Sequence, residues 1–260
     1  MLEIETATRS ERGRRENNED AVRVGQVGKT WYFLLADGAG GHARGAEASQ
    51  RVIDSIESAL LAVAPDFTPG LLDAALKAAH AQLQIDQHDA QGVQRMHSTV
   101  VALWVDMAHE RALWSHVGDS RLYRLRYGAV DTVTVDDSVV QRMVEGGLLT
   151  PAQARQHSSK NQLVSALGMD DVIEPRTLAH AVEVEDGDVF LLCCDGWWDA
   201  LTEAQILATL EQADTPSEWL DAMQREIEVQ ALPGQDNFSA IAVWIRDPSQ
   251  TTVFMLEEGV

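Results

Sequence analysis

Five acidic positions in this chain share one sequence context, because each lies beside a glycine or an asparagine at the edge of an expected strand. They are Glu19-Asp20, Asp37-Gly38, Gly118-Asp119, Asp195-Gly196 and Asp236-Asn237. Taken singly, an Asp-Gly pair is best interpreted as a turn, since aspartate caps backbone amides and short matches often arise by chance. Taken together, carboxylates at the ends of buried strands point to one end of a sheet, where they need cations or strong hydrogen bonds.

Carboxylate ligands of this kind predict a site for hard cations, so Mg²⁺ or Mn²⁺ is expected ahead of zinc. Two such ions would deprotonate a bridging water, which then attacks phosphorus in line, and they would neutralise the phosphoryl oxygens. An arginine would hold the phosphate with its planar fork of donors. Arg12, Arg14 and Arg15 all lie close to the first acidic pair, and a solvated basic face is the other interpretation of this run.

Apolar runs predict the strands that must position these carboxylates. We expect strands at Trp31–Ala36, Thr99–Val105, Arg111–Val117, Arg121–Arg126, Ala129–Val135, Val189–Cys194 and Phe238–Ile245. The Thr99–Val105 run is almost continuously apolar, which is typical of a strand that is covered on both faces.

Helices are predicted by apolar spacing and by capping residues. Val52, Ile53, Ile56, Leu60 and Val63 form one apolar stripe, and a second helical pattern follows Pro69. Capping boxes at Thr150–Gln153, Thr202–Gln205 and Thr215–Glu218 begin further helices. Strands and helices in segregated runs predict an α+β fold, with two sheets sandwiched between helix pairs and a polar insertion at Asp136–Gly168 laid over them.

The composition limits the classes of function. The 260 residues carry a formal net charge of -21, so neither nucleic acid nor an anionic membrane is an expected partner. The two cysteines, Cys193 and Cys194, are adjacent and are interpreted as strand residues rather than a disulfide framework or nucleophiles. No signal peptide or apolar run long enough to span a membrane is expected, so a cytoplasmic location is predicted.

In chain order these motifs resemble the metal-dependent protein phosphatases of type 2C, the PPM family, in its compact bacterial branch. The matching segments are Arg15–Asp20, Asp37–His42, Gly45 with Glu47, Ser98-Thr99, Val117–Arg121, Asn161 with Ala166–Gly168, Cys194–Gly196 with Asp199, and Asp236–Ser239. Each segment is weak alone, but their order and spacing from about Thr6 to Ile245 make the combination specific.

The resemblance implies a four-layer α-β-β-α sandwich with two to three Mn²⁺ or Mg²⁺ ions at one end. It assigns the first metal to Asp37, Asp195 and Asp236. It assigns the second to Asp37, the carbonyl of Gly38, and Glu19 or its bound water, and a third to Asp119 with Asp195. Arg15 matches the arginine that holds the phosphate. Asp20 and Asn237 are expected to hold these ligands in place without binding metal themselves.

The resemblance also implies the reaction, which is hydrolysis of phosphoserine and phosphothreonine on proteins, opposing a bacterial serine/threonine kinase. Asp136–Gly168 matches a flap that covers the site. A single domain over residues 1–248, a tail over residues 249–260 and a monomer are expected.

Three positions depart from the family pattern. Ala39 stands where eukaryotic members carry a histidine that is often proposed as general acid, and His42 is not assumed to replace it. The acid for the leaving group is therefore unassigned. His97 replaces a common glycine and Asp137 a common histidine, which affects loop geometry but not the expected metal ligands.

Two other functions compete with the enzyme. A pseudophosphatase would share the fold and act as a binding module, but Asp37, Asp119, Asp195 and Asp236 are all retained. An acidic binding module without metal explains poorly why the carboxylates follow expected strands. Trp197 and Trp198, beside Asp195, are interpreted as core residues rather than as a wall of a substrate groove.

Overall fold

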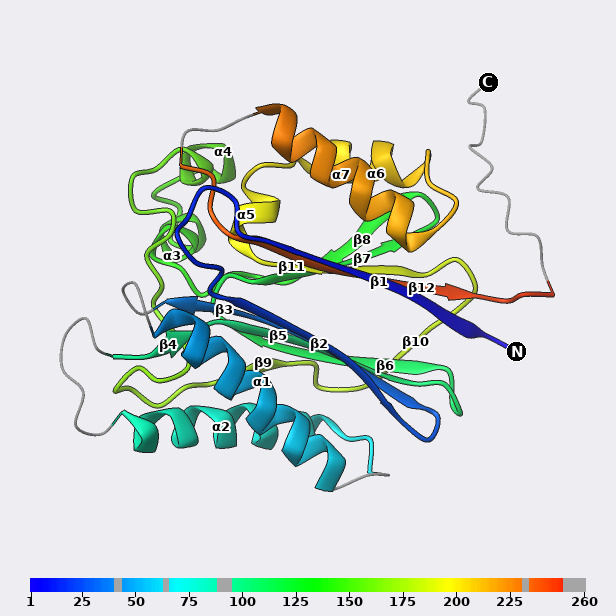
Figure 1. Cartoon of the computed structure of the whole chain (residues 1–260), viewed down its shortest axis with the longest axis horizontal. Helices are drawn as coiled ribbons and strands as arrows, with labels where there is room; N and C mark the ends of the chain where they lie inside the picture. Colours follow the sequence, from blue (N-terminus) through cyan, green and yellow to red (C-terminus); the bar gives the residue numbers. More distant parts are fainter. Residues whose placement is uncertain (40–43, 63–65, 88–94, 231–233, 250–260) are drawn as a thin grey trace.

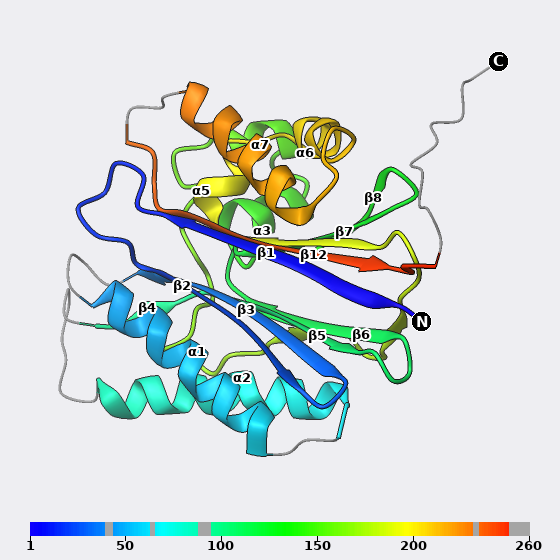
Figure 2. The ribbon, with the colours of Figure 1, turned by 45° about the vertical axis from the view of Figure 1, so that its right-hand side comes forward.

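The computed structural model describes residues 1–39, 44–62, 66–87, 95–230 and 234–249. Two antiparallel sheets lie face to face, and a pair of long helices covers the outer face of each (Figure 1). The same four layers are seen after rotation of the molecule (Figure 2). The predicted α-β-β-α sandwich is therefore confirmed.

The first sheet has five strands in the order β1-β12-β11-β7-β8. Its strands are β1 (Glu3–Glu11), β12 (Phe238–Arg246), β11 (Val189–Cys193), β7 (Arg121–Arg126) and β8 (Ala129–Val133). The two ends of the described chain pair throughout, from Glu3 opposite Arg246 to Glu11 opposite Phe238. This pairing brings the loop that follows β1 beside the Asp236 turn that precedes β12.

The second sheet has seven strands, of which five follow the order β10-β6-β5-β3-β2. They are β10 (Val182–Glu183), β6 (Arg111–Val117), β5 (Val100–Asp106), β3 (Thr30–Ala39) and β2 (Asp20–Val27), with β4 (His97–Ser98) on β3 and β9 (Arg176–Thr177) on β6. Asp20 begins β2 directly opposite Asp37 near the end of β3, so two of the predicted acidic turns meet across one ladder.

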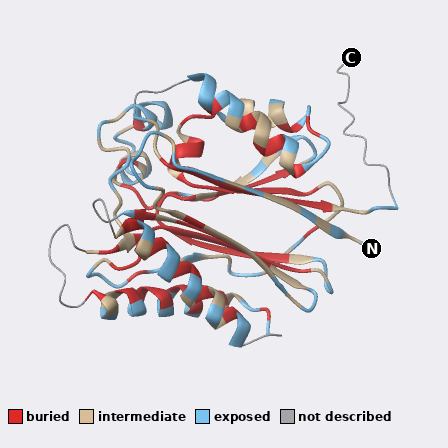
Figure 3. Ribbon diagram, in the orientation of Figure 1, coloured by how far each residue is buried: buried red, intermediate tan, exposed pale blue. Residues whose placement is uncertain are grey.

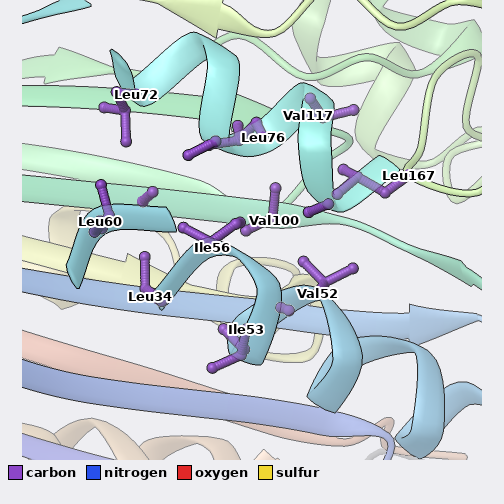
Figure 4. Packing of buried hydrophobic residues seen from close by; sticks show 14 of the residues in the cluster. Leu34, Val52, Ile53, Ile56, Leu60, Leu72, Leu76, Val100, Val117 and Leu167 are labelled. Atoms are coloured by element: carbon purple, nitrogen blue, oxygen red, sulfur yellow. The ribbon is translucent and has the colours of Figure 1, made fainter. Parts of the chain in front are cut away.

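The long helices bury apolar stripes on the sheets. Helices α1 (Gly45–Ala62) and α2 (Pro69–Asp86) pack on the second sheet, where Ile53, Ile56 and Leu76 belong to one buried cluster with Leu34 of β3 (Figure 4). Helices α6 (Glu203–Leu210) and α7 (Pro216–Gln230) pack in the same way on the first sheet. No helix in the described ranges is both long enough and apolar enough to cross a membrane.

The inner strands are buried on both faces, as Figure 3 shows in red. Leu34 faces the helices, whereas its neighbours Phe33 and Leu35 face the layer between the sheets. Because side chains alternate along a strand, a continuous apolar run can fill both layers. Strand β5 alternates in the same way, which confirms the interpretation of the Thr99–Val105 run as a strand covered on both faces.

Three short helices lie near the end of the sandwich where β3 and β11 finish. Helices α3 (Val139–Glu145) and α4 (Pro151–Arg155) belong to the expected insertion, and α5 (Asp195–Trp198) follows β11 directly. The side chains of Trp197 and Trp198 are buried, which confirms their interpretation as core residues. Helix α5 was not predicted, because four residues are too few to show a helical period.

Several strands escaped prediction from the sequence. Strand β1 alternates charged and small residues, so it offers little apolar pattern, and it is fixed by its partner β12. Strands β4, β9 and β10 have two residues each and exist only through pairing. Thr99 lies outside β5, because its amide bonds to the Asp37 carbonyl instead of the ladder. His42 and residues 250–260 of the expected tail lie outside the described residues.

The predicted helix caps are formed largely as expected. Thr150 with Gln153 and Thr202 with Gln205 form complete capping boxes. The third box is half formed, because Thr215 Oγ1 accepts from the Glu218 amide but the Glu218 carboxylate accepts from Asp214. The Glu218 carboxylate therefore binds the amide one residue before Thr215 instead of the Thr215 amide.

We expect Thr202→Ala to lower the free energy of unfolding by about 1 kcal/mol, because the amide of Gln205 loses its cap. Thr202→Ser keeps the hydroxyl and should retain most of the stability. Urea unfolding with EDTA present measures both variants. Equal losses in the two variants would contradict a role for the hydroxyl.

Candidate metal centre

One cavity of about 570 Å³ gathers the predicted site residues at the end of the sandwich where β3 and β11 finish. Its lining includes Arg15, Glu19, Asp37, Gly38, Asp119, Asp195, Asp236 and Asn237. These residues come from five separate stretches of sequence, at the left end of the molecule in Figure 1. Asp20 is the one predicted site residue outside this lining.

The aspartates of the cavity repel one another. Burial raises the pKa of Asp195 to about 7, and the charges of Asp236 and Asp20 add to the shift. Burial raises the pKa of Asp37 and of Asp119 well above their usual range, with neighbouring aspartates reinforcing both shifts. Groups of this kind accept positive charge readily, because a cation offsets both the burial and the repulsion.

The end of β3 is held by two neighbouring residues. The Thr99 hydroxyl accepts from the Asp37 amide at 3.2 Å, and the Thr99 amide donates to the Asp37 carbonyl at 2.8 Å. The Ser98 hydroxyl also donates to that carbonyl, at 3.1 Å. Thr99 in turn shares a 2.7 Å hydrogen bond with Ser120, which follows Asp119. Two predicted metal ligands are thereby joined through one threonine.

Gly38 and Glu19 are brought together by close backbone packing. The Gly38 amide donates to the Glu19 carbonyl at 3.1 Å. A Cβ atom on Gly38 would lie 2.0 Å from the carbonyl oxygen of Gly45, so a side chain there is excluded. A Cβ atom on Gly45 would lie 2.4 Å from a carboxylate oxygen of Glu19 and 2.8 Å from the Gly38 carbonyl oxygen. The Glu19 carboxylate and the Gly38 carbonyl, two expected ligands of the second metal, therefore lie close together beside Gly45.

Asn237 fixes the loop that carries Arg15 and Glu19. Its side-chain oxygen accepts from the Glu19 amide at 2.8 Å, and its amide nitrogen donates to the carbonyls of Arg12 and Asn17, each at 2.8 Å. Its backbone amide also donates to the Asp236 carboxylate at 2.8 Å. One buried side chain thus links two separate parts of the metal centre.

Asp20 lies behind Asp37. Its Oδ2 accepts from the Ser239 hydroxyl at 2.6 Å and from the Cys194 thiol at 3.3 Å, whereas its buried Oδ1 has no hydrogen-bond partner. Ligand atoms of Asp20, Asp37 and Cys194 lie within 4.8 Å of one another, the one such group of acidic, histidine or cysteine residues in the described chain. An unpaired oxygen beside acidic neighbours is a further feature that positive charge would satisfy.

The structure distinguishes Arg12, Arg14 and Arg15, among which the local sequence did not choose a phosphate-binding residue. Arg15 Nη2 donates to Asp236 Oδ2 at 2.6 Å, and this bond raises the pKa of Arg15. Arg14 also lines the cavity, whereas Arg12 Nη1 donates to the Glu16 carbonyl at 3.3 Å. Among the described residues, Arg14 and Arg15 are therefore the two cations on the cavity wall.

The segment expected to form a flap, Asp136–Gly168, meets the cavity at Asn161 and Leu163. Asp137 anchors its base, because Asp137 Oδ2 accepts from the Gly118 amide at 3.2 Å and Oδ1 from Arg176 at 2.7 Å. Asp137, one of the three departures from the family pattern, thus holds the turn that carries Asp119. His97 pairs with Ala39 at the end of β3, and burial lowers its pKa.

Trp198 is a residue of the site that the sequence placed only in the core. Its indole donates to the Asp119 carbonyl at 2.8 Å, and the Arg121 guanidinium lies 3.7 Å from its ring centre. Arg121 is itself held by two 2.8 Å bonds to Asp136 at the start of the flap. No sequence signal reveals the contacts among Asp136, Arg121 and Trp198, since these residues are 15 to 77 positions apart.

Comparison with known proteins identifies the class. A family model described as protein phosphatase 2C matches residues 8–232. The serine/threonine protein phosphatase PstP of Mycobacterium tuberculosis is 37% identical over 216 residues, which are 81% of this chain and 39% of that relative. This chain thus spans well under half of that relative's length. The serine/threonine phosphatase stp of Listeria innocua is 28% identical over 90% of this chain and 93% of its own length.

A solved structure of the catalytic domain of PstP with two manganese ions has a TM-score of 0.80 to this chain. It is 31% identical, and the match covers 95% of this chain and all of that one. Fold and sequence agree on a sandwich that carries an acidic centre at one end. This chain belongs to the protein phosphatase 2C family.

We expect Asn237→Ala to lower the free energy of unfolding by about 2–3 kcal/mol, because three hydrogen bonds to the Arg12–Glu19 loop are lost from a buried position. Asn161→Ala, an exposed position of the same cavity, should change stability little. Chemical unfolding measures both. Similar values for the two variants would contradict the role of Asn237 in holding the loop.

Without metal, we expect the protein to lose stability as the pH rises from about 5.5 to about 8. The pKa of Asp195 is raised to about 7 and that of Asp20 to about 6 in the folded state, so the unfolded chain binds fewer protons across this range. Unfolding is therefore favoured as the pH increases. Thermal melting in EDTA measures the loss.

Asp195→Asn removes one of these ionisations and should flatten the pH profile. Saturating Mn²⁺ should raise the melting temperature more at the higher pH, where fewer protons compete with the metal. A metal-free profile that rises with pH would contradict the raised pKa values.

Proposed function

We propose that this protein removes phosphate from phosphoserine and phosphothreonine side chains of proteins, in a reaction that requires Mn²⁺ or Mg²⁺. The observation that carries the proposal is the convergence of Asp37, Asp119, Asp195 and Asp236 on one cavity that also contains Arg15. Relatives named as serine/threonine phosphatases across nearly their whole length support the same reaction.

The chain offers ligands for two to three cations. Asp37, Asp195 and Asp236 would hold the first, and Asp37, the Gly38 carbonyl and Glu19 the second. Asp119 with Asp195 would hold a third. When bound, divalent cations neutralise the phosphoryl oxygens and activate water for in-line attack on phosphorus. The two manganese ions in the PstP structure support metal dependence.

The protein's own residues would bind and orient the substrate. Arg15 carries a planar fork of donors that suits two phosphoryl oxygens. In the free protein, Arg15 Nη2 donates to Asp236 Oδ2 at 2.6 Å. The substrate phosphate would therefore replace a carboxylate that Arg15 already binds. Asn237 keeps Arg15 and Glu19 in place through the loop carbonyls and amide that it binds.

The serine or threonine oxygen that leaves phosphorus must take up a proton to become a hydroxyl. Ala39, at the exposed end of β3 in the cavity wall, has no side chain that could supply it. The pKa of the adjacent strand partner His97 is lowered by burial, so its neutral form is favoured at neutral pH. Neither of these two described residues is suited to supply the proton, and we propose that water in the cavity does so.

The flap would influence which phosphoproteins are accepted, because Asn161 and Leu163 extend it to the cavity. We propose a cytoplasmic monomer that opposes a bacterial serine/threonine kinase and acts on that kinase and its targets. The alternative, a binding module without activity, is less consistent with four retained aspartates around one cavity.

We expect the chain with Mn²⁺ to hydrolyse a phosphothreonine peptide, with EDTA abolishing turnover. Asp195→Ala should reduce kcat about 10³-fold or more, because electrostatic stabilisation of the transition state is the largest catalytic contribution. Asp214→Ala, an exposed aspartate before α7, is the matched control and should retain activity. Phosphate release measures all samples.

No turnover from folded protein that Mn²⁺ stabilises would favour the pseudophosphatase. Neither turnover nor a shift in melting temperature with millimolar Mn²⁺ would contradict the metal ligands as well.

A further inference from the structure

The two cations on the cavity wall, Arg14 and Arg15, differ in their surroundings. Arg15 bonds to Asp236 at 2.6 Å. The Arg14 side chain is exposed and has neither a hydrogen bond nor an ion pair with any described residue. An arginine with five free donors is notable in a chain where 41 acidic residues outnumber 20 basic ones.

The backbone of Arg14 is held firmly although its side chain is not. Gly13 has a φ of +59°, and a Cβ atom there would lie 2.1 Å from the Asp236 carbonyl oxygen. The Arg14 amide donates to the Gln235 carbonyl at 2.9 Å, and Asn237 binds the Arg12 carbonyl at 2.8 Å. The loop is therefore clamped against the segment that carries Asp236. The backbone of Arg14 is therefore held in one position beside the cavity.

The side of Arg14 that faces away from the metal centre is less suited to an anion. Arg14 also borders a second hollow of about 240 Å³, which carries Glu11 and Glu228. Neither carboxylate forms an ion pair with Arg14 within 4.0 Å in the described structure. The cavity side also carries carboxylates, but the divalent cations proposed to bind them would offset their charge. With these cations in place, a bound anion is expected on the cavity side of Arg14.

We propose that Arg14 binds a second anionic group of the substrate, close to the phosphoserine or phosphothreonine that is hydrolysed. A carboxylate or a second phosphate has the required chemistry, since both present oxygens to the guanidinium fork. Arg14 thereby selects segments with acidic or phosphorylated neighbours. The inference rests on the proposed phosphatase function, and it names the substrate class of that same cavity.

A preference for acidic neighbours is the opposite of what the net charge of the whole chain predicts. A protein with a net charge of -21 should disfavour acidic peptides through long-range repulsion. A preference for acidic neighbours would therefore require a local cation with free donors, and Arg14 is that group on the cavity wall. Removing the Arg14 side chain should therefore expose acidic peptides to repulsion by the net negative charge of the protein.

The test measures kcat/KM with Mn²⁺ on phosphothreonine peptides that differ only in the residues on either side of the phosphothreonine. The neighbours are serines, glutamates, or non-hydrolysable phosphonate analogues of phosphoserine. Wild-type protein is expected to prefer both acidic peptides over the serine peptide. Arg14→Ala should reduce this preference about fivefold, the effect typical of one partly exposed charged contact. The glutamate and phosphonate peptides distinguish the two sources of the anion.

Two variants serve as controls. Arg14→Lys keeps the charge but not the fork, so it should retain part of the preference. Arg225→Ala removes an exposed arginine of α7 that lies outside the cavity lining, and it should leave the preference unchanged. Circular dichroism of each variant excludes a folding defect.

The same preference is measured independently of turnover, by fluorescence anisotropy with peptides whose phosphothreonine is replaced by its phosphonate analogue. Weaker binding of the acidic peptides to Arg14→Ala would support the proposal even if hydrolysis were absent. An equal loss for all three peptides would show that Arg14 serves the reacting phosphate, and would overturn the proposal. Wild-type protein without any preference would also overturn it.

Discussion

Mutual repulsion among buried carboxylates is the constraint around which this end of the sandwich is organised. Burial raises the pKa of Asp37, Asp119 and Asp195, and their charges raise one another's pKa further. Such an arrangement is costly in the absence of positive charge. If divalent cations bind these groups as proposed, their binding would offset this cost and stabilise the native state.

The surrounding backbone is arranged to hold these charges in place. Thr99 joins the Asp37 strand to the turn after Asp119, and Asn237 joins the Glu19 loop to Asp236. Gly38 and Gly45 approach so closely that neither tolerates a Cβ atom. The contacts of Thr99 with Asp37 and of Asn237 with Glu19 link segments that are distant in sequence, so the centre depends on the completed sandwich rather than on any single loop.

The flap is tied to the centre through the turn that carries Asp119. Asp137 binds the Gly118 amide, and Arg121 connects Asp136 to the ring of Trp198, whose indole binds the Asp119 carbonyl. A movement of the flap base would therefore be transmitted to one predicted metal ligand. The proposed role of Arg14 lies on a different wall, in the loop after β1, so substrate selection need not depend on the flap alone.

The sequence by itself determined the apolar strands, the two long helices near residues 45–86, the capping boxes at Thr150 and Thr202, and the acidic turns, because each depends on neighbouring residues. Motif order added the family and its expected ligands. Only the tertiary structure decided that β1 pairs with β12, that Trp198 supports Asp119, and that Arg14 and Arg15 rather than Arg12 face the cavity. These features arise from contacts between residues far apart in the chain, which leave no periodic signal for a local pattern to reveal.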